Sequence, residues 1–321
     1  EAVMKHKNIK TLKHENSKPD VIAVTAGPGL ITGLVVGVEA AKALSYLWDV
    51  PLVAVNHIAG HAHSVEISDF RFQISDLSGD KTTANQKKSA ICNLQSAINY
   101  PAIALIVSGG HTELLLMTNP TTFELIGKTR DDAAGEAFDK VGKLLGFDYP
   151  GGPKISKFAE TGDPTAINFP RPMLEKDNFE FSFAGLKTAA LYWLREHGFE
   201  SGIRNNELGI TLNDFCASFE QAVIDVLIAK TISAAKKYQP KTIILGGGVS
   251  ANKKLRETLK QSIQSIIPNS LFLIPDLNYA MDNGAMIAVA GYYKAVKNEF
   301  TDWREIRAEP NWEVYARMDF F

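Results

Sequence analysis

The stretch 241-KTIILGGGVSAN-252 joins a short apolar run, three consecutive glycines and an asparagine that can begin a helix. The aliphatic run favours a buried strand, and the glycines favour a tight turn at its end. A helix that starts after such a turn presents free backbone N–H groups, which suit an anion or a nucleotide. The spacing is neither GxGxxG nor GxxxxGK[ST]. The stretch therefore predicts a strand–turn–helix unit without a dinucleotide fingerprint or a P-loop.

The same alternation of short apolar runs and helical periodicity continues along the chain on both sides of this unit. Further strands are expected at 21–26, 51–56, 102–108, 113–118 and 271–275, and helices at 33–48, 131–146, 184–197, 212–237 and 282–296. Alternating strands and helices predict the α/β class. The polar stretch 67–101 interrupts the alternation and is interpreted as an insertion. We expect two α/β lobes, residues 1–118 and 119–321.

Composition limits the classes of function. The chain has 321 residues, of which 45% are hydrophobic and 22% charged, and its net charge is −2. Nucleic-acid binding would therefore need a local basic patch or partner proteins. The two cysteines, Cys92 and Cys216, lie far apart, which is typical of a reducing compartment. No apolar run reaches the roughly 18 residues of a membrane span, and the first residues lack the apolar core of a signal peptide, so we expect a cytoplasmic protein without a membrane partner.

Histidines gather in 55-VNHIAGHAHS-64. Asn56 can cap a helix that begins at His57, and His57 and His61 then lie one turn apart on the same face. This spacing lets a helix offer two imidazoles to one metal ion, but partly exposed helix histidines give the same pattern. The intervening residues include no glutamate, so the pattern disfavours an HExxH metallopeptidase.

Two other segments contain residues that suit a metal or ligand site. In 281-MDNGAMIA-288, Asp282 precedes an apolar helix and is either a third metal ligand or only an N-cap. In 107-VSGGHT-112, Gly109 and Gly110 join two predicted strands, where they either expose N–H groups to a ligand or form a plain hairpin turn. Each segment alone leaves both alternatives open.

Taken in order, seven segments resemble one family. They are NHxxGHxHS, VSGGHTEL, DDAAGEAFDKVGKLLG, YPGGP, FSFAGLKTA, LGGGVSANKKLRE and DNGAMIA. This order resembles the TsaD/Gcp family of tRNA N6-adenosine threonylcarbamoyltransferases, in its bacterial form, from about Pro19 to Trp312.

The resemblance implies an actin-like ATPase (ASKHA) fold, with two lobes around a nucleotide cleft and the helix 282–296 packed back at that cleft. It implies an acyltransferase, an N6-L-threonylcarbamoyladenine synthase. This enzyme moves the threonylcarbamoyl group from threonylcarbamoyl-AMP to N6 of the adenosine 3′ of the anticodon, in tRNAs that read ANN codons. A metallopeptidase, an older label of the family, and a non-catalytic nucleotide-binding scaffold are the alternatives.

The resemblance also implies the site. His57, His61 and Asp282 match metal ligands for one divalent ion, Fe²⁺ or Zn²⁺. Residues that match substrate-binding positions are Val107, Ser108, Gly109, Gly110, His111, Asp139, Gly152 and Asn252. The cleft is expected to hold ATP, ADP or threonylcarbamoyl-AMP, and no side chain is expected to act as a nucleophile. The expected partners are tRNA, TsaB-like and TsaE-like proteins, and a TsaC-like enzyme that supplies the adenylate.

The sequence departs from the family at its start. The family begins with a strand hairpin that carries an ExSCD-like segment, and this chain has no counterpart of it. We therefore expect a first lobe that lacks this hairpin. The resemblance is compatible with a cytoplasmic location or, in a eukaryotic cell, with the mitochondrial matrix.

Overall fold

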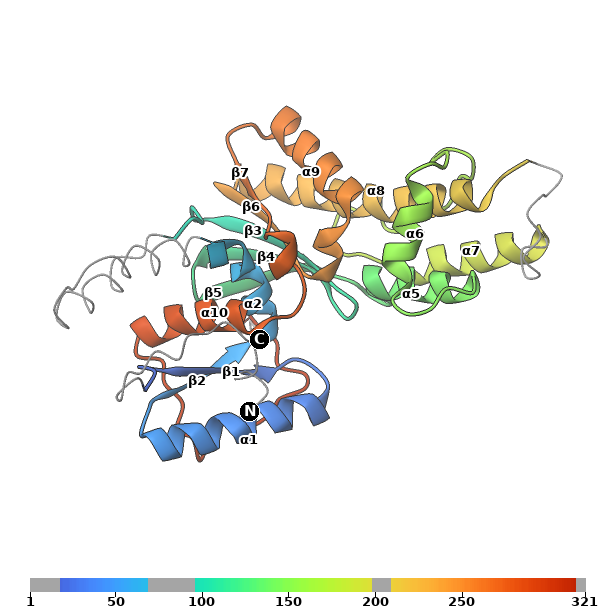
Figure 1. Ribbon diagram of the computed structural model, residues 1–321. Helices are drawn as coiled ribbons and strands as arrows, with labels where there is room; N and C mark the ends of the chain where they lie inside the picture. The colour runs from blue at the N-terminus through green and yellow to red at the C-terminus, as the bar shows by residue number, and fades with distance from the viewer. Residues whose placement is uncertain (1–17, 69–95, 198–208, 316–321) are drawn as a thin grey trace, which may run out of the picture.

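The computed structural model describes residues 18–68, 96–197 and 209–315. Its strands form two sheets, and two helices lie between them (Figure 1). These helices are α2 (His57–His63) and α10 (Gly284–Val296). Because they lie between the two sheets, α2 and α10 are positioned by both.

The smaller sheet is a parallel pair, β1 (Ile22–Gly27) and β2 (Leu52–Asn56), connected by α1 (Ile31–Trp48). Helix α1 places four residues at helical spacing on one face of the pair: Leu34, Val38, Ala41 and Ser45. Helix α10 covers the other face, where its apolar residues pack against Val53 and Val55. This pair of strands is thus enclosed between two helices.

The larger sheet is mixed. Its strands, in spatial order, are β5 (Thr122–Lys128), β4 (Thr112–Asn119), β3 (Ala102–Val107), β6 (Thr242–Gly246) and β7 (Leu271–Leu273). The first three are antiparallel neighbours, whereas β6 and β7 run parallel to β3. Every residue of β3 and β6 is buried, as expected for strands that are covered on both faces.

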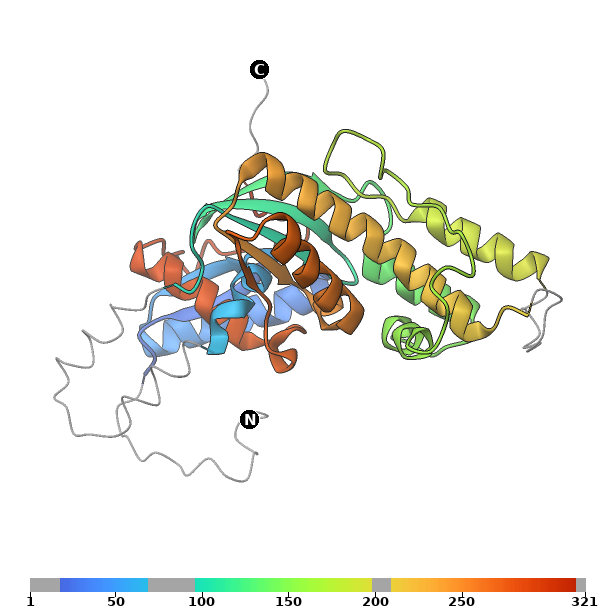
Figure 2. The ribbon, with the colours of Figure 1, turned by 90° about the horizontal axis from the view of Figure 1, so that it is seen from above.

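Five helices lie in the same part of the chain as the larger sheet, between its strands in sequence. They are α5 (Ala134–Leu144), α6 (Gly151–Ala159), α7 (Ala184–Glu196), α8 (Leu212–Tyr238) and α9 (Lys253–Ile266). The long helix α8 runs along one face of this sheet and continues beyond it toward α6 and α7 (Figure 2). The main hydrophobic core lies between these elements and includes four fully buried aromatic side chains, Phe181, Phe183, Phe215 and Phe219.

The predicted α/β alternation is confirmed, with differences at particular elements. Strand β5 and helix α6 were not predicted, and the helix predicted from 282 begins two residues later. The predicted boundary between 118 and 119 falls inside the larger sheet, one residue before the end of β4; a division by sheets would fall between β2 and β3. Most of the predicted insertion 67–101, and Cys92 within it, lies outside the described residues.

Among the described helices, α1 is long and apolar enough to cross a membrane by length and composition alone. The helix buries one face on β1 and β2 and carries an ion pair between Lys42 and Glu39 on its surface. Both features are also those of a helix that covers a sheet, so length and composition here are weak support for a membrane span.

Candidate metal centre and nucleotide cavity

Helix α2 forms as the sequence predicts. Asn56 is its N-cap, and the side-chain oxygen of Asn56 accepts a hydrogen bond of 2.9 Å from the Ile58 amide. The Asn56 side-chain amide donates to the Trp312 carbonyl oxygen at 3.0 Å, which ties the start of α2 to a distant segment. His57 and His61 then share one face, with ring centroids 4.7 Å apart.

Asp282 completes the cluster from the other inner helix. The cap of α10 is Asn283, whose side-chain oxygen accepts from the Met286 amide, so the Asp282 carboxylate is not the N-cap. One carboxylate oxygen, Oδ1, lies 3.4 Å from His57 Nε2 and 3.1 Å from His61 Nε2. The three ligand atoms all lie within 4.8 Å of one another.

These separations fit a divalent ion. Two donors that each lie about 2.1 Å from an ion at the tetrahedral angle are roughly 3.4 Å apart. His61 is fully buried, yet neither of its ring nitrogens has a hydrogen-bond partner. Its Nε2 is close to Asp282 without the alignment of a hydrogen bond. A buried polar atom without a partner is costly unless something else binds it, and a metal ion satisfies this requirement.

The electrostatics of the cluster agree with this fit. Close contact with the ring nitrogens of His57 and His61 holds the pKa of Asp282 well below its usual range, although burial opposes the shift. The carboxylate is therefore ionised at any physiological pH. Two imidazoles and one carboxylate are a ligand set that Fe²⁺ and Zn²⁺ both accept, and three protein ligands leave a position open.

The predicted substrate turn 107–111 lies beside the cluster. Val107 ends β3, and the turn is closed by a hydrogen bond from the Ser108 amide to the His111 carbonyl oxygen at 2.8 Å. The amides of Gly110 and His111 both point to the Ser108 hydroxyl oxygen, at 3.3 and 3.1 Å. In the described residues, the Gly109 amide is the one in this turn without an internal acceptor, so we expect it to be the donor that is available to a ligand.

His111 interacts electrostatically with the cluster of His57, His61 and Asp282, hereafter the metal-type cluster. Burial first, and then the proximity of His57 and His61, lower the pKa of the His111 imidazole to about 4, while Asp282 acts in the opposite direction. The ring is therefore neutral at pH 7 and offers a lone pair beside the cluster.

Two glycines allow the elements around the cluster to approach closely. Gly247, in the GGG turn after β6, has φ 86°, and a Cβ there would lie 2.4 Å from the Val107 carbonyl oxygen. Gly60, on α2, faces α10, and a Cβ there would lie 2.8 Å from Ile287. The GGG turn and the histidine helix thus pack directly against β3 and α10.

A cavity of about 400 Å³ adjoins this region. It brings together four of the predicted substrate residues, Gly109, Asp139, Gly152 and Asn252. Several lining residues were not predicted, among them Tyr149, Ser156, Val249 and Met281. Gly248 of the GGG turn also lines the cavity, and Met281 directly precedes Asp282 in the chain, although none of the three candidate ligands lines it. The other predicted substrate residues, Val107, Ser108, Gly110 and His111, do not line it.

Two of these lining side chains have structural partners. Asp139 Oδ1 accepts from the amides of Gly151 and Gly152 at 2.8 and 3.3 Å, at the start of α6. Asn252 caps α9, and its side-chain amide donates to Ser156 and to Glu220 at 2.9 and 2.7 Å. Both residues therefore stabilise the walls of the cavity, in addition to any contact with a bound ligand.

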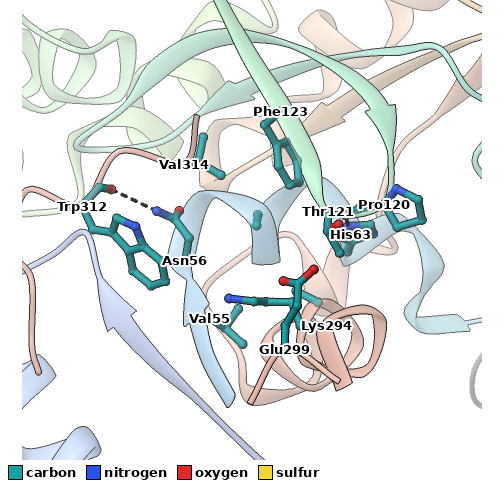
Figure 3. A pocket seen from close by; sticks show the side chains of 12 residues that line it. Val55, Asn56, His63, Pro120, Thr121, Phe123, Lys294, Glu299, Trp312 and Val314 are labelled. Carbon is teal, nitrogen blue, oxygen red and sulfur yellow. Dashed lines mark hydrogen bonds between the residues drawn. The ribbon is translucent and has the colours of Figure 1, made fainter. Parts of the chain in front are cut away.

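A smaller cavity, about 100 Å³, lies on the opposite face of α2 (Figure 3). Asn56, Ala59 and His63 line it from α2 and its cap, and Lys294 lines it from α10. The Lys294 ammonium donates to the Ala54 carbonyl oxygen at 2.8 Å, and burial lowers its pKa. The metal-type cluster and this cavity thus lie on the two sides of one short helix.

Comparison with solved structures defines the class of fold. The chain is similar to the crystal structure of T. kodakarensis HypF, with a TM-score of 0.55 and 15% identity, over 88% of this chain and 41% of that one. A full-length HypF described as phosphate- and nucleotide-bound gives a TM-score of 0.55 at 14% identity, over 87% and 39% of the two chains. At this identity the likeness concerns the fold alone.

Sequence comparison is more specific. The family of TsaD, tRNA N6-adenosine threonylcarbamoyltransferase, matches residues 3–74 and 88–289, and this chain belongs to that family. A relative from Lactobacillus acidophilus is 43% identical over 93% of this chain and 76% of its own length. Relatives from Listeria monocytogenes and Desulfotalea psychrophila are each 44% identical, over 85% and 87% of this chain and 69% and 72% of their own lengths. All three carry the name tRNA N6-adenosine threonylcarbamoyltransferase. Nothing among these similarities favours a metallopeptidase.

Proposed function

We propose that this chain transfers the threonylcarbamoyl group from threonylcarbamoyl-AMP to N6 of the adenosine 3′ of the anticodon in tRNAs that read ANN codons. The observation that carries the proposal is the cluster of His57, His61 and Asp282 in a chain of this family, together with a cavity of about 400 Å³ lined by Met281, the neighbour of Asp282. The sequence between the two histidines has no acid, so the same cluster lacks the base that a zinc peptidase requires.

We further propose that the two sheets are the cores of two ASKHA-type lobes and that the cavity is their nucleotide cleft. The GGG turn, the Asn252 cap and the start of α6 contribute glycines and small side chains to the lining of this cavity. Such a surface lets a phosphate or a ribose approach the main chain closely. Helix α10 follows Asp282 directly, which supports the predicted position of the last helix at the cleft.

In the proposed reaction, the metal-type cluster and the Gly109 amide have different roles. The N6 amine attacks the carbamoyl carbon, a C–N bond replaces the bond from that carbon to the phosphate oxygen, and AMP leaves. His57, His61 and Asp282 would hold the divalent ion, which supplies a Lewis acid for the carbamoyl or phosphate oxygen. The Gly109 amide is placed to donate to developing negative charge, and no side-chain nucleophile is required.

An exposed apolar face of α1 supports one of the proposed partners. Helix α1 exposes several large apolar side chains, with exposed fractions of 71% for Val36, 64% for Tyr46 and 70% for Leu47. A patch of this kind marks a protein interface, which supports a TsaB-like partner. We keep a TsaE-like protein, tRNA and a TsaC-like supplier of the adenylate as the other expected partners. A cytoplasmic or mitochondrial-matrix location follows from a tRNA substrate.

The test is complementation followed by nucleoside mass spectrometry. A strain that depends on the full-length protein would receive His61→Ala or Asp282→Ala, and threonylcarbamoyladenosine in its tRNA would be quantified. Loss of a Lewis acid that contributes several kcal/mol predicts a decrease of roughly 100-fold or more in the rate of modification. His197→Ala, at the end of α7 and away from the cluster, is the matched control. Unchanged modification in both site variants would contradict the proposed role of the cluster.

A further inference from the structure

A buried polar network lies directly behind the metal-type cluster. His63 and Glu66 are 1% and 1–2% exposed, and His63 Nδ1 lies 2.7 Å from Glu66 Oε2. The other ring nitrogen, Nε2, lies 2.8 Å from the Pro120 carbonyl oxygen in the turn between β4 and β5. Figure 3 shows His63 beside Pro120 and Thr121 at one end of the smaller cavity, and the Asn56–Trp312 hydrogen bond at the other.

The partners define which atoms donate in this network. A carbonyl oxygen can only accept, so His63 Nε2 carries a proton toward Pro120. Glu66 Oε1 accepts from the Ser96 hydroxyl at 2.6 Å and from the Tyr293 hydroxyl at 2.9 Å. Burial alone would raise the pKa of Glu66, but these hydrogen bonds and the one from His63 lower it below its ordinary value. Glu66 is thus a carboxylate, and one of its oxygens lies 2.7 Å from His63 Nδ1.

This network links the two elements that carry the candidate ligands. His63 is the last residue of α2, which holds His57 and His61, and Tyr293 lies on α10, which follows Asp282. The rings of His63 and Tyr293 are 4.9 Å apart, so packing adds to the hydrogen bonds. A single carboxylate, Glu66, therefore contacts side chains from both helices.

A buried, hydrogen-bonded carboxylate adds little net stability, because desolvation offsets the attraction of its partners. What it adds is a fixed geometry, since moving either partner leaves a buried charge without a partner. Asn56 and its bond to Trp312 fix the first turn of α2, and His63 fixes the last. A helix of seven residues that is fixed at both ends keeps its two metal-facing rings in one orientation.

We propose that His63, Glu66 and Tyr293 form a positioning network that sets α2 against α10 and thereby holds His57, His61 and Asp282 at ligating distance. His63 is a positioning residue and not a ligand. The inference rests on the metal centre of the proposed function. It extends that function by naming residues that tune metal affinity from the opposite face of α2.

The test titrates the full chain with Co²⁺ alone and follows the visible ligand-field absorption. Removing a partner that orients a metal ligand commonly weakens metal binding 10–100-fold. We therefore expect Tyr293→Phe and Glu66→Gln to raise the Kd for Co²⁺ by about tenfold or more. His63→Phe should behave alike and still bind one Co²⁺ with an absorption of similar form, because the three ligands remain. Tyr192→Phe, on an exposed face of α7, is the control for removing a tyrosine hydroxyl.

Further measurements separate positioning from general stability. Thermal unfolding without metal identifies variants that only unfold more easily, and a variant with lower stability but an unchanged Kd counts against the proposal. In a double-mutant cycle, Tyr293→Phe with Glu66→Gln should bind Co²⁺ about as weakly as Glu66→Gln alone, because both act through one hydrogen bond. If His61→Ala loses the absorption while all three network variants bind Co²⁺ normally, the network is not a positioning device. If His61→Ala itself binds normally, the metal centre fails and the inference with it.

Discussion

At the scale of single residues, His61 is a candidate metal ligand whose burial opposes folding of the metal-free chain. The side chain is fully buried, and its two ring nitrogens have no hydrogen-bond partner in the described part of the chain. An unsatisfied buried polar atom costs about 1–3 kcal/mol. Without metal, this residue therefore weakens the fold.

This cost gives a residue-scale prediction. His61→Leu should raise the free energy of unfolding of the metal-free chain by about 1 kcal/mol or more, because it removes the unpartnered atoms. The same variant should lose the stabilisation that added Zn²⁺ gives the unaltered chain. Urea unfolding with and without Zn²⁺ measures both effects. His57→Leu is the comparison: its side chain is 19% exposed, so a smaller gain is expected, and an equal gain would contradict the argument from burial.

Glu113 gives a pH-dependent prediction at the same scale. Burial raises the pKa of Glu113 to about 7, with Lys128 opposing and Glu313 reinforcing the shift. The folded chain therefore holds a proton that the unfolded chain releases, so stability falls as pH rises from the ordinary value of 4.5 through 7. Glu113→Gln should be nearly neutral at pH 4.5 and stabilising by about 2–3 kcal/mol at pH 8. Urea unfolding at pH 4.5 and pH 8 measures the change in the free energy of unfolding. Equal changes at both pH values would contradict the prediction.

At the scale of elements, α2 depends on its cap. Asn56→Ala removes both the cap and the bond to Trp312, and should cost about 1–2 kcal/mol. Asn56→Asp keeps the capping oxygen but loses the donor, so it should cost less. Chemical unfolding of the two variants separates these contributions. A larger loss for Asn56→Asp than for Asn56→Ala would be inconsistent with the capping role.

Some helices and strands could be predicted from the local sequence, and others could not. Helix α2 was predictable because its cap and both histidines are local. Helix α6 was not, because 151-GGPKISKFA-159 starts with poor helix formers, and its first amides are satisfied by Asp139 from another helix. Strand β5 was missed because it is an edge strand with exposed and half-buried positions and only two buried ones.

At the scale of the whole molecule, the candidate site was predicted by family resemblance and not by local pattern. Spacing alone left His57 and His61 open between metal ligands and ordinary helix histidines, and Asp282 open between a ligand and a cap. Only the tertiary structure shows that Asn283 takes the capping role and that the carboxylate faces both rings. The Glu66 network was invisible in the sequence, because its partners lie 30 and 227 residues away.

The exposed face of α1 gives a whole-molecule prediction. Val36→Glu and Leu47→Glu should weaken association with a TsaB-like partner at least about tenfold, because each places a charge in an apolar interface. Both positions are exposed, so the stability of the chain alone should change by less than about 0.5 kcal/mol. Calorimetric titration with the purified partner and thermal unfolding measure the two effects. Tyr192→Glu, on α7, is the control, and equal weakening by it would contradict an interface on α1.

The long-range contacts around α2 also impose an order in time. Glu66 meets Tyr293 across 227 residues, and Asn56 meets Trp312 across 256. At about 5–20 residues per second, the ribosome would deliver Tyr293 roughly 11–45 s after Glu66. During that interval the glutamate lacks its hydroxyl partner on α10, and the two histidines lack Asp282. Capture of a metal ion by all three candidate ligands would therefore require that Asp282 has been synthesised and that α10 has packed against α2.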